Sequence, residues 1–127
     1  MTKILKPKIA PRTIIGRVKK GQRLGDKIGL KTANLNIELA KKFKKGLYTC
    51  QIVLNKKTYK GLLYYGYNSL SNKDCLEIHI SNFNKNIYRK KITVTINRYL
   101  RSPKKFASIE KLAEQVKKDL NSVIRYS

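Results

Sequence analysis

Short segments in which apolar and polar residues alternate dominate residues 12–100 of this chain. Alternation places every second side chain on one face of a strand, as in Cys75–Ile80 and Lys91–Ile96. No segment between them has the pattern of a helical crossover, which parallel strands need. We therefore expect about six short antiparallel strands, and a small closed barrel is the natural way to remove the free edges of such a sheet.

The expected strands are rich in β-branched residues or alternate in polarity. They are Thr13–Val18 with a glycine bulge, Asn34–Ile37, Gly46–Leu54, Thr58–Tyr65, Cys75–Ile80 and Lys91–Ile96. Residues 55–57 form a hairpin turn between two of them, residues 66–73 form a turn-rich loop, and residues 38–45 have room for one helical turn. After Pro103 the apolar spacing becomes helical, which predicts an amphipathic C-terminal α-helix over 107–124 with Ser108 as its N-cap.

Length and composition favour a single folded domain over residues 1–127, with 1–11 as an N-terminal arm and 12–100 as the barrel. No apolar run approaches the roughly 20 residues of a membrane span, and the N-terminus lacks a signal-peptide core. Cys50 and Cys75 fall in expected strands without metal-site spacing, so we expect free thiols in a cytoplasmic protein.

The formal net charge of +23 raises the question of nucleic-acid binding. Most of the positive charge comes from Lys in short pairs spread over the whole chain, whereas Arg is better suited to bidentate phosphate recognition. We interpret the charge mainly as solvated surface that attracts small anionic molecules, and we do not expect nucleic acid as a partner.

A ladder of glycines runs from Gly16 through Gly21, Gly25 and Gly29 to Thr32-Ala-Asn34. Glycine lets a ligand approach the main chain, and successive N–H groups in such a loop form a concavity that binds anions. The hydroxyl and carboxamide at its end are neutral oxygen ligands that suit Mg²⁺. A run of turns between strands is the alternative explanation for the glycines alone.

Glu77 is the unusual acidic residue, since it lies in mid-strand between Leu76 and Ile78. It is a candidate general base only if the glycine loop lies beside it; otherwise it is an exposed strand residue. His79 shares its face, and as the sole His of the chain it argues against a zinc cluster or a hydrolytic triad.

These motifs resemble, in order along the chain, those of the riboflavin kinase (flavokinase) family. The matching elements are Gly16-Arg-Val18-Lys-Lys-Gly21, Gly25, Gly29, Lys31-Thr32-Ala33-Asn34-Leu35, Gly46-Leu47-Tyr48, Tyr59-Lys60-Gly61, Leu76-Glu77-Ile78-His79-Ile80, Phe83 to Ile87-Tyr88, Leu100-Arg101, Lys105-Phe106, Leu112, Gln115-Val116 and Asp119. Ordered motifs over nearly the whole chain are far more specific than the glycine loop alone. The resemblance implies a six-stranded Greek-key barrel with a C-terminal helix.

The resemblance also implies an ATP-dependent enzyme that transfers the γ-phosphoryl group to the 5′-hydroxyl of riboflavin and makes FMN. Glu77 would take the hydroxyl proton, Thr32 and Asn34 would ligate Mg²⁺, and Arg101 and Phe106 would lie beside the flavin. The expected ATP-binding residues are Gly16, Val18, Gly21, Gly25, Gly29, Lys31, Thr32 and Asn34. We expect a monomer, and a separate FAD synthetase acting downstream, since the chain lacks the adenylyltransferase half of the bacterial bifunctional enzymes.

Two departures from the family pattern keep other functions open. Lys31 replaces the proline before Thr-Ala-Asn, which removes a fixed φ and adds a cation that we expect to supplement phosphate binding. The usual turn after the Tyr59-Lys-Gly61 strand is replaced by residues 64–69, without its proline. The alternatives are a catalytically weakened flavin- or nucleotide-binding barrel and a basic nucleic-acid-binding barrel whose tyrosines stack on bases.

Overall fold

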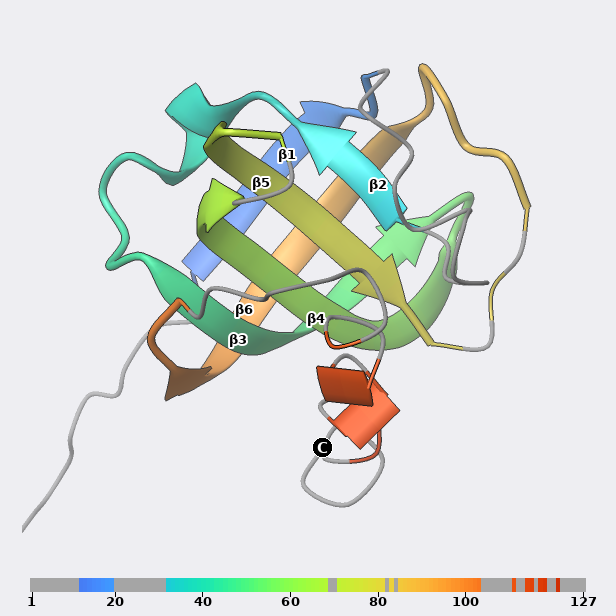
Figure 1. Ribbon diagram of the computed structural model, residues 1–127. Coiled ribbons are helices and arrows are strands. Elements are labelled where there is room, and N and C mark those ends of the chain that lie inside the picture. The colour runs from blue at the N-terminus through green and yellow to red at the C-terminus, as the bar shows by residue number, and fades with distance from the viewer. Residues whose placement is uncertain are drawn as a thin grey trace, which may run out of the picture.

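The computed structural model describes residues 12–19, 32–68, 71–81, 83, 85–103 and six residues between 111 and 121. Within this part of the chain, six strands form one antiparallel sheet and a short 3-10 helix follows the second strand (Figure 1). The elements are β1 (Arg12–Arg17), β2 (Thr32–Leu35), η3 (Ile37–Ala40), β3 (Gly46–Leu54), β4 (Lys57–Asn68), β5 (Lys73–Ile80) and β6 (Lys91–Arg101). The predicted mainly β fold is confirmed.

The strand order in the sheet is β1-β6-β3-β4-β5-β2. Strands β3, β4 and β5 follow one another as a meander, and β6 returns to pair with β3 rather than with β5. Three consecutive strands with a fourth beside the first make a Greek key. In this order β6, β3, β4, β5 and β2 are successive neighbours in the sheet.

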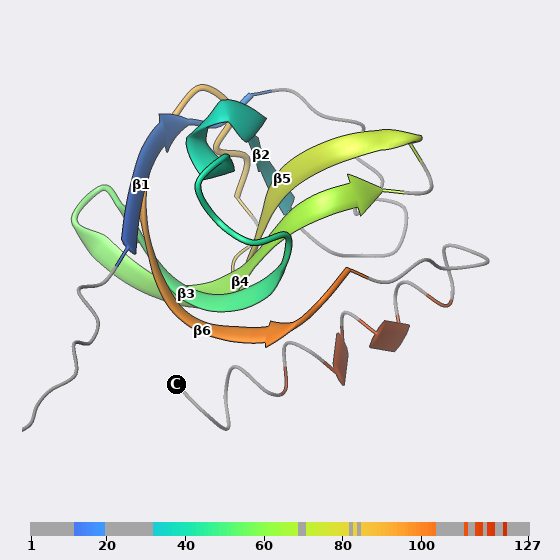
Figure 2. The ribbon, with the colours of Figure 1, turned by 90° about the vertical axis from the view of Figure 1, so that its left-hand side faces the viewer.

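The predicted closure of the barrel is wrong, because the sheet curls into a half-barrel whose outer strands do not form a ladder. Among the described residues, β1 and β2 meet through one isolated bridge, in which the Lys19 N–H donates to the Asn34 carbonyl at 2.8 Å. Both strands are short, so little backbone is left to pair. Figure 2 shows the two outer strands on the same side of the molecule as η3, whose Leu39 side chain lies against Gly16.

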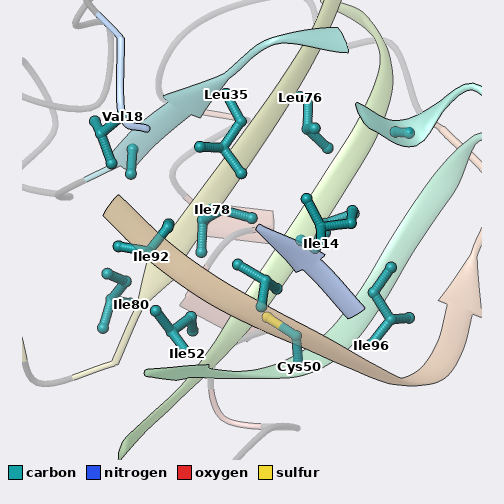
Figure 3. Close-up of a cluster of buried hydrophobic side chains, with 14 of the residues drawn as sticks. Ile14, Val18, Leu35, Cys50, Ile52, Leu76, Ile78, Ile80, Ile92 and Ile96 are labelled. Carbon is teal, nitrogen blue, oxygen red and sulfur yellow. The ribbon is translucent and has the colours of Figure 1, made fainter. Parts of the chain in front are cut away.

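The core fills the concave face of the curled sheet (Figure 3). The alternating segments predicted this inward set, and Ile92, Val94 and Ile96 are all buried as expected. In the same way, Leu76, Ile78 and Ile80 of β5 face the core. The residues between them, Cys75, Glu77 and His79, are therefore left on the outer face.

Most strand boundaries differ from the predicted ones, and β6 runs five residues further, to Arg101. β2 spans Thr32–Leu35 and so begins and ends two residues earlier, while β4 runs to Asn68 through part of the expected loop. The predicted bulge at Gly16 is also wrong, because β1 pairs with β6 in unbroken register from Arg12 to Arg17. The missing side chain at Gly16 instead makes room for Leu39, whose Cδ1 would lie 2.6 Å from an added Cβ.

The predicted hairpin between β3 and β4 is confirmed, with Leu54 paired to Lys57. Its two turn residues, Asn55 and Lys56, have φ values of 51° and 67°. Positive φ at both central positions is the signature of a type I′ turn, whose twist matches that of the flanking strands.

The N-terminal arm and most of the predicted C-terminal helix lie outside the described residues. The six residues described between 111 and 121 have helical backbone, but no continuous helix is described there, so the helix over 107–124 stays a prediction. In the described part of the chain, no helix has the length and apolar character needed to cross a membrane.

Candidate functional site

The candidate site lies on the outer face of the sheet, around Glu77 of β5. The pairing register places Asn34 of β2 directly opposite Glu77 on one side and Tyr64 of β4 directly opposite it on the other. Tyr64 is in turn paired with Leu47 of β3, and Leu47 with Arg101 of β6. These five residues form one row across five strands, which we call the Glu77 row.

A second row runs parallel to the first. His79 of β5 is paired with Thr32 of β2 and with Leu62 of β4, and Leu62 is paired with Thr49 of β3. Residues directly opposite on neighbouring strands have Cβ atoms about 5 Å apart. Thr32 and Asn34 therefore face the outer surface beside His79 and Glu77, while Ala33 between them is buried.

Glu77 is a candidate general base only if the glycine loop lies beside it, and the end of that loop does lie beside it. The end of the glycine ladder, Thr32 to Asn34, pairs along its whole length with the strand that carries Glu77. The Glu77 side chain is half-buried and projects outward rather than into the barrel. A carboxylate in this place has hydroxyl and carboxamide neighbours on one side and an aromatic and apolar surface on the other.

Arg101 ends β6 at the opposite end of the Glu77 row. Its guanidinium is close enough to Tyr64 to lower the phenol pKa, against the larger effect of burial, which raises it. Glu77 also raises the pKa of Tyr64, and the net result is a value of about 12. Arg101, Tyr64 and Glu77 thus share one electrostatic environment.

Cys75 precedes Glu77 by two residues on the same face of β5. Burial raises the pKa of the Cys75 thiol, and the Glu77 carboxylate raises it further, in part through a side-chain hydrogen bond. Asn68 of β4 acts in the opposite direction and lowers the pKa of this thiol through a side-chain hydrogen bond. A neutral thiol beside Glu77 is a hydrogen-bond donor and not a nucleophile.

Several predicted ligand-binding residues do not belong to the rows. Gly16 lies within β1, and the Val18 side chain is buried in the core. Both backbone polar groups of Val18 are paired with the segment before β6, through Lys90 O at 2.9 Å and Arg89 N at 2.8 Å. The remaining predicted residues lie outside the described residues: Gly21, Gly25, Gly29, Lys31 and Phe106.

Two neighbours of Glu77, Tyr64 and Cys75, were not predicted as site residues. Tyr64 belongs to a segment where three tyrosines, Tyr64, Tyr65 and Tyr67, follow one another closely, and local pattern alone does not say which of them lies opposite Glu77. The cross-strand register supplies that information, and register depends on tertiary pairing. Cys75 was predicted on the face of Glu77, but without a role in the site.

A magnesium ion would find suitable donors at Thr32 and Asn34. A hydroxyl and a carboxamide are neutral oxygen ligands, and Mg²⁺ in phosphoryl-transfer sites takes few protein ligands together with substrate phosphates and water. The described residues contain no cluster of three or more His, Cys, Asp and Glu side chains that fits a metal ion. The chemistry of Thr32 and Asn34 is thus compatible with Mg²⁺ held jointly with a nucleotide.

Comparison with known sequences points to one family. The family model described as Flavokinase, riboflavin kinase, matches residues 9–127. The chain is 36% identical over 122 residues to the bifunctional riboflavin kinase/FMN adenylyltransferase of Buchnera aphidicola, covering 91% of this chain and 39% of that protein. It is 31% identical over 115 residues to the RNA-binding riboflavin kinase RibR of Bacillus subtilis, covering 88% of this chain and 50% of that protein. The chain therefore spans half or less of the length of these two relatives.

Solved structures give the same fold. The crystal structure of riboflavin kinase from Trypanosoma brucei superimposes with a TM-score of 0.64 at 17% identity, covering 94% of this chain and 81% of that one. A structure described as a macrolide-efflux protein from Streptococcus pneumoniae gives a TM-score of 0.79 at 28% identity, covering 93% of this chain and 40% of that one. The fold is shared between proteins with different descriptions, so the fold alone does not decide the activity.

Proposed function

Because the chain belongs to the riboflavin kinase family, we propose that it transfers the γ-phosphoryl group of ATP to the 5′-hydroxyl of riboflavin, giving FMN and ADP. One observation carries this proposal: the register that sets Asn34 at the end of the glycine ladder directly opposite Glu77. Phosphoryl transfer needs positioning and charge neutralisation more than covalent help from the protein.

In the proposed reaction, the Glu77 carboxylate accepts the proton of the acceptor hydroxyl. The 5′-oxygen forms a bond to the γ-phosphorus, and the bond from that phosphorus to the ADP oxygen breaks. Thr32 and Asn34 would hold Mg²⁺, which supplies charge neutralisation on the phosphates when bound. The loop over residues 21–31, with Lys31, is proposed to surround those phosphates.

The Glu77 row then divides between the two substrates. The nucleotide occupies the β2 side, where the glycine ladder ends, and riboflavin occupies the side of β4, β3 and β6. Strands lie about 4.8 Å apart, so Glu77 and Arg101 are separated by about 14 Å along the sheet. That length suits an acceptor whose hydroxyl lies at Glu77 while its ring system extends towards Arg101.

The direct test is to incubate the purified protein with riboflavin and Mg-ATP and to separate the products by chromatography. FMN formed in proportion to protein is the expected result. If FMN is absent while riboflavin and ADP both bind, the chain is a flavin- and nucleotide-binding barrel instead.

A Glu77→Gln variant tests the assigned base. We expect kcat to fall by about 100-fold or more, since general-base catalysis contributes about that factor, with the Kd for riboflavin little changed. Glu38→Gln is the matched control, because Glu38 is exposed and paired only with Lys41 in the described structure. Full activity of Glu77→Gln would refute the assignment.

RNA binding is the second candidate function. Among four adjacent strands, β1, β6 and β4 contain Arg or Lys, β3 has no charged residue, and none of the four contains Asp or Glu. One relative is described as an RNA-binding riboflavin kinase. An affinity for a single-stranded RNA oligonucleotide that falls steeply with salt would support this function. No binding at low salt would remove it.

A further inference from the structure

Tyr64 belongs to the Glu77 row but neither to the main hydrophobic core nor to the predicted set of ligand-binding residues. Its ring is half-buried on the outer face of β4, directly opposite Glu77 on β5 and directly opposite Leu47 on β3. Leu47, Leu62 and Leu100 form with it a second apolar cluster, separate from the main core. An aromatic ring thus lies next to the candidate base and packs against the buried side chains of Leu47 and Leu62.

The position of Tyr64 is held by its hydroxyl group. That hydroxyl donates to the Tyr67 carbonyl at 2.6 Å, within the same strand. Burial is the largest influence on the phenol and raises its pKa to about 12, so the side chain stays neutral at physiological pH. A neutral, fixed aromatic ring is suited to packing and not to proton transfer.

The sides from which the two substrates approach Glu77 determine which of them contacts the Tyr64 ring. With the nucleotide on the β2 side of Glu77, the acceptor hydroxyl reaches Glu77 from the opposite side. The next residue of the row on that side is Tyr64, about one strand spacing from Glu77. The part of the acceptor that follows its hydroxyl must therefore pass over Tyr64 before it reaches Arg101.

We propose that Tyr64 is an acceptor-binding residue, against which riboflavin packs when its 5′-hydroxyl lies at Glu77. The inference rests on the proposed function and adds a specificity determinant to it. An acceptor with a planar ring system gains contact with the Tyr64 ring, whereas a small polyol that carries only the reacting hydroxyl does not. Aromatic contacts of this kind contribute about 0.5–1.5 kcal/mol beyond the buried area.

The first test uses steady-state kinetics of Tyr64→Leu and Tyr64→Phe. For Tyr64→Leu we expect the KM for riboflavin to rise by about two- to thirteenfold, the factor to which about 0.5–1.5 kcal/mol corresponds. The kcat and the KM for ATP should stay within about twofold, since the lost contact is made equally in the ground and transition states. Tyr64→Phe keeps the ring and its packing against Leu47 and Leu62 but loses the hydrogen bond to Tyr67, so the KM for riboflavin should rise less than in Tyr64→Leu.

The second test is spectroscopic and requires no turnover. A tyrosine ring against the flavin quenches its fluorescence, so riboflavin bound in the presence of Mg-ADP should be quenched by the wild-type protein. Bound riboflavin should become brighter in both Tyr64 variants, because neither phenylalanine nor leucine quenches flavins as tyrosine does. Tyr67→Leu is the matched control, since Tyr67 lies on the same strand and its hydroxyl donates to Asn72 at 2.7 Å; it should behave as wild type.

The outcomes separate this inference from the proposed function. If the wild type forms no FMN, the proposed function fails first. If the wild type forms FMN but Tyr64→Leu keeps its KM for riboflavin and its quenching, Tyr64 does not contact the acceptor. If Tyr64→Leu does not fold, Tyr64→Phe alone decides, because unchanged fluorescence of the bound flavin in that variant contradicts the proposal.

Discussion

Gly61 and Gly16 differ in what a methyl group would meet at each position. A Cβ on Gly61 would run into the backbone carbonyl of His79 on the neighbouring strand, whereas on Gly16 it would meet the end of the partly exposed Leu39 side chain. Backbone in a paired strand moves little, while a side chain rotates away. The two glycines therefore predict different costs for the same substitution.

Gly61→Ala should lower the free energy of unfolding by about 1–3 kcal/mol, the usual cost of overpacking. Gly16→Ala should cost less than about 1 kcal/mol by the same comparison, because Leu39 can adjust. Urea denaturation followed by circular dichroism measures both values. Equal losses in the two variants would contradict the distinction between backbone and side-chain contact.

The thiols of the buried Cys50 and the half-buried Cys75 predict how stability responds to alkaline pH. Burial raises the pKa of both Cys50 and Cys75 above the ordinary value of 9.0. Above that value the unfolded chain loses the thiol protons while the folded chain keeps them, so the free energy of unfolding must fall as pH rises. Their contribution to stability is fully present below pH 9.0 and is lost progressively above it.

Urea denaturation between about pH 7 and about pH 10.5 should show this loss, with each thiol contributing up to about 1.4 kcal/mol per pH unit. Cys50→Val removes one titrating group from the unfolded chain and should flatten the slope above pH 9. A slope that is unchanged in Cys50→Val would mean that other groups dominate, among them Tyr64.

The candidate site was predicted only partly at this scale. Thr32, Asn34, Glu77 and Arg101 come from motifs, and they do fall in the two rows on one face. Tyr64 was missed because its position depends on the pairing of β4 with β5, which local pattern does not determine. The Val18 side chain is buried in the core, and its predicted role in nucleotide binding stays a prediction.

At the scale of elements, the outer strands are the weakest part of the sheet. β3 is paired on both sides, with β4 and β6. Within the described part of the chain, β1 pairs in a ladder only with β6 and β2 only with β5. The bridge between Lys19 and Asn34 adds one hydrogen bond between the free sides. Edge elements with few partners open locally at lower free energy than central ones.

Hydrogen exchange measured by NMR should therefore protect the amides of β3 more than those of β1 and β2. The amide of Lys19 should exchange more slowly than other amides at the free edge of β1, because it donates to Asn34. Uniform protection across all six strands would indicate a closed barrel in solution and contradict the half-barrel.

Alternation predicted the strands well but not their ends or the closure. The inward residues of β5 and β6 follow directly from a period of two, and the Asn55–Lys56 turn follows from its residue types. We inferred a closed barrel because free strand edges must be removed, but in the structure η3 packs against β1 instead. This packing depends on a tertiary contact between Leu39 and Gly16, which local sequence pattern does not predict.

For the molecule as a whole, the net charge of +23 is the dominant long-range feature. Like charges repel within the compact state and lower its stability. The ion pairs found in the described structure, Lys41 with Glu38 and Lys45 with Asp74, are exposed and contribute little. Added salt should therefore weaken the repulsion between like charges more than it weakens the attraction within these ion pairs, and so stabilise the folded state.

The melting temperature should rise when sodium chloride is increased from about 0.02 M to about 0.3 M, over which the screening length falls severalfold. Sodium acetate at equal ionic strength is the control and should give a similar rise. A rise confined to sulfate or phosphate would point instead to an anion bound at a particular site. A fall in chloride would mean that ion pairing outweighs repulsion.

The Glu77 row also has a consequence for how the protein can be divided. Its members come from distant parts of the chain, and a cut between Asn68 and Ser71 would leave Asn34, Leu47 and Tyr64 on one fragment and Glu77 and Arg101 on the other. Neither fragment would carry a complete row. Any phosphoryl transfer recovered on mixing the two would then report the reassembly of β4 with β5, which would make this half-barrel a candidate for a split-enzyme reporter.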